Sequence, residues 1–218
     1  MQKKSVLRTS QIPENMAYPR RVQELIEDFA RLPGIGPRQA ARFVYALLAR
    51  DDSFLASFAG HIRGLKTETM LCGSCFRITE QRPGQACDIC TASSRDHNKI
   101  LVVEKDTDVE NFEKSGVFSG VYHVLGGSIS ALEKNSAEKI HLRELFERVK
   151  SLAIKDEQVE IIIATSNNLE GNQTATYIER ILEPLTVSVT RLGRGLSTGS
   201  EIEYADPMTL EQALQNRK

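Results

Sequence analysis

The residues of this chain best suited to chemistry are its four cysteines, which all fall within a 19-residue stretch. They form two C-x2-C pairs separated by eleven residues: Cys72, Cys75, Cys87 and Cys90. Two such pairs bring four sulfurs to one tetrahedral ion, which zinc prefers. Because four thiolates leave no open coordination position, the spacing predicts a structural zinc site. A redox-active pair is the alternative, but two pairs at this separation favour a metal.

The surroundings of the cysteines also favour a metal over disulfides. A 19-residue segment cannot bury a core of its own, so metal binding would supply its folding free energy. The N-terminal sequence MQKKSVLRTSQIPENMAYPRR lacks the apolar region of a signal peptide, and no run of about 18 apolar residues predicts a membrane span. We therefore expect a cytoplasmic protein that uses no membrane, in which thiols stay reduced.

Charge is distributed unevenly along the chain. The net charge is −1, but residues 1–50 carry nine Lys or Arg and four Asp or Glu, which leaves +5 there and −6 on the other 168 residues. A basic end on a mildly acidic body suggests that one face meets a polyanion. The alternative is an ordinary solvated helical surface, and charge alone does not decide between the two.

Apolar residues recur at helical spacing before the cysteines and predict helices at about 21–31, 38–49 and 53–68. The first two helices are joined by the sequence Leu-Pro-Gly-Ile-Gly-Pro at 32–37. Its prolines remove amide donors, and Gly34 and Gly36 permit turn conformations closed to other residues. The stretch therefore predicts a tight helical hairpin.

Such a hairpin can bind phosphate. The tight turn leaves backbone amides free at the start of the second helix, where the helix dipole also favours an anion. Arg38 and Arg42 lie one turn apart on that helix and can reach the same nucleic-acid backbone. These contacts would be independent of base sequence. The pattern resembles the helix-hairpin-helix DNA-binding motif; the alternative is a hairpin whose glycines only make the turn.

After the cysteines the pattern changes to alternating strands and helices. Short apolar runs predict strands at 100–103, 121–125, 161–164 and 187–192. Helical patterns lie between them at about 107–115, 138–152 and 171–183, and a last helix is expected at about 208–216. This order predicts an α/β fold with a mainly parallel sheet.

Two acidic residues follow strands of this predicted sheet. Glu104 ends the first strand, and Glu170 lies in the turn after the third. Functional groups gather at the carboxyl ends of parallel strands, so the two carboxylates could share a magnesium ion. The alternative is that each is a solvated or helix-capping acid.

The sequences VVEKDTDVENFEKSG and ATSNNLEGNQTATYIERIL resemble a Toprim domain, the metal-binding module of topoisomerases, primases and some nucleases. The resemblance places Glu104 at the early Glu of catalytic Toprim domains. The two positions of their D-x-D motif hold Ser166 and Asn168 here, and the E-G-E motif ends in Asn172. With so few carboxylates, the sequence does not favour phosphoryl-transfer chemistry.

The three modules in this order resemble the RecR family of bacterial recombination mediators, over roughly residues 20–217. The resemblance extends to SGVYHVLGG at 119–127 and TRLGRG at 190–195. We expect the following division: an N-terminal arm at 1–19, a helix-hairpin-helix domain at 20–70, a zinc finger at 71–91, a Toprim domain at 98–193 and a C-terminal segment at 194–218.

The resemblance implies a non-enzymatic protein of recombinational DNA repair, located in the cytoplasm with the nucleoid. Family members work with RecO and often RecF, and help RecA to replace single-strand-binding protein on gapped DNA. They form rings, typically tetramers, that can encircle DNA. A magnesium-dependent Toprim nuclease or primase-like enzyme is the competing function, and an interaction module that never touches DNA is the third.

Overall fold

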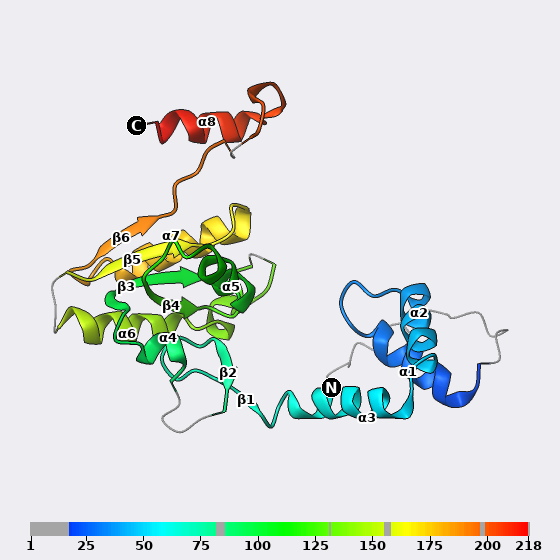
Figure 1. Ribbon diagram of the computed structural model, residues 1–218. Helices are drawn as coiled ribbons and strands as arrows, with labels where there is room; N and C mark the ends of the chain where they lie inside the picture. Colours follow the sequence, from blue (N-terminus) through cyan, green and yellow to red (C-terminus); the bar gives the residue numbers. More distant parts are fainter. Residues whose placement is uncertain (1–17, 82–85, 131, 155–157, 197–198, 218) are drawn as a thin grey trace, which may run out of the picture. The chain divides into compact units, whose positions relative to one another are not determined.

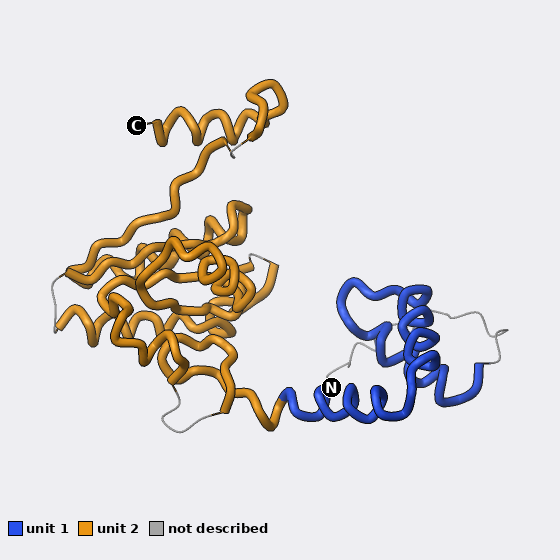
Figure 2. The backbone as a smooth tube through the Cα atoms, viewed as in Figure 1, with its two compact units in different colours: residues 1–65 blue, residues 66–218 orange. Residues whose placement is uncertain are grey.

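The computed structural model describes residues 18–81, 86–130, 132–154, 158–196 and 199–217, and forms two compact units. The first unit is Met1–Leu65 and the second is Lys66–Lys218 (Figure 2). Most of the expected N-terminal arm, residues 1–17, lies outside the described residues. In the described part of the chain, no helix is long and apolar enough to cross a membrane.

The first unit consists of three helices, as the apolar pattern predicts: α1 (Arg20–Ala30), α2 (Pro37–Leu48) and α3 (Asp52–Gly64). α1 and α2 form the hairpin, with Pro37 as the first residue of α2. The side chain of Asp51 caps α3 by accepting from the Phe54 amide. The prediction that this helix runs to about 68 is wrong at its end, because the chain leaves the helix at Gly64, a poor helix former.

The core of the first unit is small. Ile26 of α1 packs against Ala40 and Val44 of α2, and all three are at most 3% exposed. Partly buried apolar residues surround them: Tyr18, Val22, Phe29, Ala30, Ile35 and Ala41. Since Val22, Ile26 and Phe29 recur at helical spacing, they form one apolar face of α1, and this face packs on α2.

The second unit begins with the cysteine stretch. Two short strands, β1 (Thr69–Leu71) and β2 (Ile78–Glu80), pair antiparallel. The one-turn helix α4 (Asp88–Thr91) follows. The apolar pattern predicts none of these three elements, because each is only three or four residues long.

A four-stranded parallel sheet forms the centre of the second unit (Figure 1). Its strands are β3 (Asp96–Val103), β4 (Gly120–Val124), β5 (Glu160–Ala164) and β6 (Ser188–Arg191), in the order β4-β3-β5-β6. The connecting helices are α5 (Asp106–Ser115), α6 (Leu142–Ala153) and α7 (Leu169–Leu182). The predicted α/β fold with a mainly parallel sheet is confirmed.

The predicted helix at 138–152 is wrong in its first turn. A 3-10 turn, η1 (Ser136–Lys139), comes first, and Ile140 is extended, with φ −119° and ψ 158°. The His141 amide then donates to the Leu125 carbonyl at 2.9 Å, which ties the chain to the end of β4. Since that hydrogen bond is incompatible with a continuous helix, α6 starts only at Leu142.

The chain ends with the 3-10 turn η2 (Ile202–Tyr204) and the helix α8 (Pro207–Gln215). Asp206 caps α8 by accepting from the Thr209 amide at 3.0 Å, and Pro207 is its first residue. The predicted last helix is therefore confirmed.

Candidate metal centre and nucleic-acid interface

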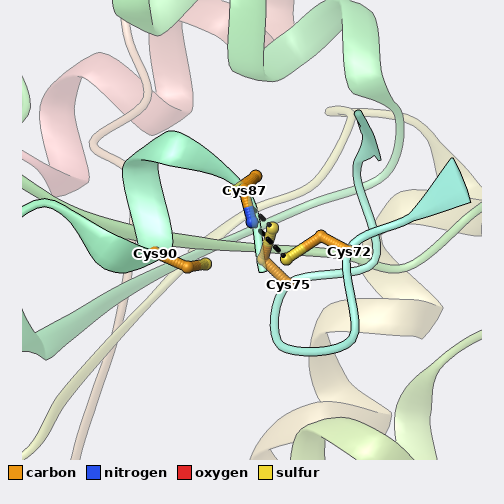
Figure 3. A group of neighbouring side chains, drawn as sticks. All are labelled: Cys72, Cys75, Cys87 and Cys90. Carbon is orange, nitrogen blue, oxygen red and sulfur yellow. Dashed lines mark hydrogen bonds between the residues drawn. The ribbon is translucent and has the colours of Figure 1, made fainter. Parts of the chain in front are cut away.

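The four cysteines converge from two turns of the chain, as Figure 3 shows. Their Sγ atoms all lie within 4.8 Å of one another, and the Cys75 and Cys87 sulfurs are 3.6 Å apart. Cys90 is half-buried and the other three are buried. Among the residues that the structure describes, this is the one group of three or more His, Cys, Asp or Glu side chains that could hold a metal.

These distances fit a tetrahedral metal site. A zinc–sulfur distance of about 2.3 Å gives sulfur–sulfur edges of about 3.8 Å in a tetrahedron. The Cys75–Cys87 separation is close to this edge and far longer than a disulfide of about 2 Å. The Cys87 amide also donates to the Cys72 sulfur at 3.3 Å, the kind of contact that orients a ligand.

The thiols perturb one another's titration. Hydrogen bonding with the Cys75 side chain, and then with that of Cys90, holds the pKa of Cys87 well below its usual range. The same hydrogen bond to Cys87, reinforced by one with Cys90 and by burial, raises the pKa of Cys75 far above the usual range. The pKa of Cys90 is raised as well, so the negative charge of the group lies chiefly on Cys87.

The cysteine knuckle is fixed to the end of the parallel sheet. The Val124 amide of β4 donates to the Cys75 carbonyl at 2.8 Å. The next residue, Phe76, has a φ of 62°, which is unfavourable for a side chain of this size. Its ring stacks on His141 with centroids 4.2 Å apart and lies 5.4 Å from the ring of buried His123. The knuckle is thus continuous with the sheet's core.

A second attachment follows the knuckle. The Arg95 guanidinium donates to both Glu113 oxygens, at 2.9 and 2.5 Å, and to the Phe118 carbonyl. The Tyr122 hydroxyl donates to the same carboxylate at 2.6 Å. Burial would raise the pKa of Glu113, but these donors outweigh it and hold the pKa below its usual value. This network joins the segment after α4 to α5 and β4.

The turn of the hairpin leaves its glycines open to solvent. Gly34 has a φ of 77°, in the left-handed region that favours glycine, whereas the φ of Gly36 is −82°. A Cβ atom at either position would meet no heavy atom within 4 Å. No side chain caps α2, and Pro37 has no amide, so the amides that follow it are available for an anion.

The arginines of the hairpin fall into two groups. Arg20 and Arg21 pair with Glu24, and Arg31 pairs with Asp28. Arg38 and Arg42 are exposed, and no carboxylate of the described residues pairs with either. The two arginines next to the free amides of α2 are therefore the ones whose charge is uncompensated, in keeping with the expected phosphate contacts.

The two acidic residues of the sheet have different surroundings. Glu104 is only 5% exposed, and its carboxylate accepts from the Ser166 amide at 3.0 Å and the Ser166 hydroxyl at 2.6 Å. Glu170 lies in the exposed first turn of α7. Sequence reasoning noted Ser166 only as a missing aspartate and did not predict its contact with Glu104.

Gly171 is required by the close approach of α7 to this site. A Cβ atom there would lie 2.0 Å from the Ser166 carbonyl oxygen and 3.0 Å from Oε1 of Glu104. The Asn168 side chain caps α7 by accepting from the Gly171 amide at 2.7 Å. Ser166, Asn168 and Gly171 thus serve local structure around the Glu104 carboxylate.

Hairpin, cysteine knuckle and parallel sheet together define a class of Toprim-containing proteins of DNA metabolism. Family models match the hairpin, the sheet domain and the C-terminal region. The helix-hairpin-helix of RecR matches residues 22–64, a Toprim domain matches 98–193, and the C-terminal region of RecR matches 195–218.

Similar proteins extend the match to more than nine tenths of the chain. The recombination protein RecR of Herpetosiphon aurantiacus is 44% identical over 92% of this chain and 95% of its own length. The protein of the same name from Staphylococcus saprophyticus is 42% identical over 93% of this chain and 98% of its own length. The chain belongs to the RecR family of recombination proteins.

Proposed function

We propose that this protein is a mediator of recombinational DNA repair that binds DNA through its hairpin and promotes RecA loading on gapped or single-stranded DNA. RecO, and in some settings RecF, would be its partners. The observation that carries the proposal is the order of three modules, hairpin, four-cysteine knuckle and Toprim domain, in a chain that its RecR relatives match over nearly their whole length.

In this proposal the hairpin supplies DNA affinity. Gly34 and Gly36 shape the turn, and the amides at the start of α2 bind a phosphate. Arg38 and Arg42 neutralise the adjacent phosphates of the DNA backbone. The uncompensated charge of these two arginines supports this role. Because such contacts go to the backbone, binding would be independent of base sequence.

The cysteines would hold a structural zinc ion. Cys72, Cys75, Cys87 and Cys90 fill all four positions, so no water or substrate could reach the metal, and its contribution would be to folding. We also propose that the protein assembles into a ring, as a tetramer, so that several hairpins act on one DNA molecule.

The Toprim unit would serve in contacts with partner proteins rather than in catalysis. The direct hydrogen bonds from Ser166 to Glu104 support this role, because they occupy the carboxylate that a catalytic metal would need. The exposed position of Glu170 suits a partner contact at the same edge of the sheet.

The test is reconstitution. Gapped DNA is coated with single-strand-binding protein, and RecA loading is followed through its DNA-dependent ATP hydrolysis, with and without this protein and RecO. Loading should accelerate only when both are present. A gel shift at low and moderate salt, and light scattering of the protein alone, check DNA binding and assembly. A strict monomer without DNA affinity would contradict the proposal.

A further inference from the structure

The exposed face of α2 carries an aromatic ring beside its two free arginines. Arg38, Arg42 and Tyr45 are four and three residues apart, which places them within about 60° around the helix axis. All three are exposed, Tyr45 to 53%. The buried residues of α2, Ala40 and Val44, lie on the other side of the helix. Tyr45 is therefore not needed for the core of this unit.

A neighbouring ring holds Tyr45 in place. The Tyr18 ring lies edge-on to it, with centroids 6.3 Å apart and planes at 66°. Tyr18 itself packs against the core formed by Ile26, Ala40 and Val44. This contact limits the rotamers of Tyr45 while more than half of its surface remains exposed, so a ligand that stacks on it would cost little further side-chain entropy.

Charge and chemistry together select the ligand. Among the described residues, Arg38 and Arg42 have no carboxylate partner, so the surface beside Tyr45 is positive. A nucleic acid is a polyanion that also offers the aromatic faces of its bases. Sites that bind single strands usually combine an aromatic ring with basic side chains that hold the phosphates. In a duplex the bases are already stacked on their neighbours, whereas an unpaired base can turn its face to a tyrosine.

We propose that Tyr45 stacks on an unpaired base of single-stranded DNA whose phosphates are held by Arg38 and Arg42. The inference rests on the proposed DNA binding by the hairpin and adds to it a preference for single strands and gaps over intact duplex. The phosphate contacts would form with single-stranded and duplex DNA alike, whereas the stack on Tyr45 would form only with single-stranded DNA.

The chain contains no tryptophan, so Tyr45→Trp creates a single fluorophore at the proposed site. The full-length variant is titrated with dye-labelled oligothymidylate and, separately, with a blunt duplex that carries the same dye. The anisotropy of the dye measures binding in both titrations. The single strand should quench the indole fluorescence as it binds, and the duplex should bind with little quenching. Tyr177→Trp, at a 40% exposed position of α7, is the matched control and should not be quenched.

Two further variants separate stacking from apolar contact. Tyr45→Phe should keep the affinity for oligothymidylate, whereas Tyr45→Leu, which retains apolar surface but no ring, should bind about tenfold more weakly, as expected when a base–aromatic stack is removed. The salt dependence should stay unchanged in both, since no phosphate contact is removed. Duplex affinity should be unaffected.

The outcomes separate this inference from the proposed function. Binding of the single strand without quenching, or equal binding by Tyr45→Leu and Tyr45→Phe, overturns the role of Tyr45 and leaves DNA binding by the hairpin intact. Absence of any binding in the unsubstituted protein overturns both. If the fluorescence changes with protein concentration alone and is then insensitive to DNA, a second copy of the chain covers the exposed face of α2. The inference is then wrong.

Discussion

Ser166 donates both its backbone amide and its hydroxyl to the carboxylate of Glu104. The resemblance to catalytic Toprim domains places an aspartate where this serine stands. Two carboxylates so close together would repel each other unless a cation lay between them, whereas a serine binds the glutamate directly. The contact therefore removes the electrostatic reason for a metal at this position.

Loss of the Ser166 hydroxyl should destabilise the second unit. Ser166→Ala removes a 2.6 Å hydrogen bond to a largely buried carboxylate, and such charge-assisted bonds contribute about 1.5–3 kcal/mol. Denaturant unfolding of the variant measures the loss. Ser151→Ala is the control, because its hydroxyl bonds a carbonyl at an exposed position and should change stability by less than about 0.5 kcal/mol. Equal effects of the two substitutions would contradict the structural role of Ser166.

Glu104 should not support metal-dependent cleavage. Labelled single-stranded and duplex DNA incubated with the protein and magnesium or manganese should stay intact, because Ser166 donates to both oxygens of the Glu104 carboxylate. Glu104→Gln should then alter stability but no catalytic rate. Cleavage that requires metal and disappears in Glu104→Gln would establish the nuclease alternative instead.

Metal removal should unfold the cysteine knuckle rather than abolish a reaction. Cys72→Ser removes one ligand and a strong chelator removes the whole ion. In either case the two cysteine turns lose the cross-link that would hold them together. The unfolding temperature should fall by several degrees, since about 1 kcal/mol corresponds to about 2–4 °C for a chain of this size. Bound zinc is measured by elemental analysis.

Readdition of zinc provides the control for this experiment. Chelator-treated wild-type protein should recover its unfolding temperature and its assembly when zinc returns, and Cys72→Ser should not. If a metal-free Cys72→Ser variant kept normal folding and assembly, the structural role of the ion would have to be abandoned.

The free arginines of α2 should carry the salt dependence of DNA binding. Arg38→Ala combined with Arg42→Ala should weaken binding to all sequences alike and lower the log–log salt slope by roughly 2 units, about 0.9 for each duplex phosphate that the protein no longer neutralises. Fluorescence anisotropy at several salt concentrations measures both effects. The matched control is Arg20→Ala with Arg21→Ala, which removes the same charge from side chains already paired with Glu24. An equal change of slope in the control would show that only net charge matters.

Elements with strong periodicity were predictable, and elements that depend on distant contacts were not. Short apolar runs alternate with helical patterns along the chain, and this alternation predicts a parallel sheet. Two of these runs are Ile100–Val103 and Ile161–Ala164. The break before α6 depends on the hydrogen bond from the His141 amide to Leu125, sixteen residues away in sequence, which no local pattern reports.

The same distinction applies to the candidate sites. Cys72, Cys75, Cys87 and Cys90 were predictable as a cluster because their spacing alone determines what one ion can bind. The contact between Ser166 and Glu104 was not, since the residues are 62 positions apart and meet only because β3 and β5 are neighbours in the sheet. A serine at the carboxyl end of the strand next to a buried glutamate is the signal that could have revealed it.

The two glycines of the hairpin turn should respond differently to substitution by alanine. Gly34 has a φ of 77°, so Gly34→Ala should destabilise the first unit by about 1 kcal/mol. Gly36 has an ordinary φ of −82° and open space around its Cα, so Gly36→Ala should leave the free energy of unfolding nearly unchanged. Its added methyl group would nevertheless stand at the start of α2, where a phosphate is expected to approach, and DNA affinity should fall. Unfolding curves and anisotropy of the two variants measure these effects side by side. If Gly36→Ala binds DNA as tightly as the unsubstituted protein, the phosphate does not approach the backbone at this turn.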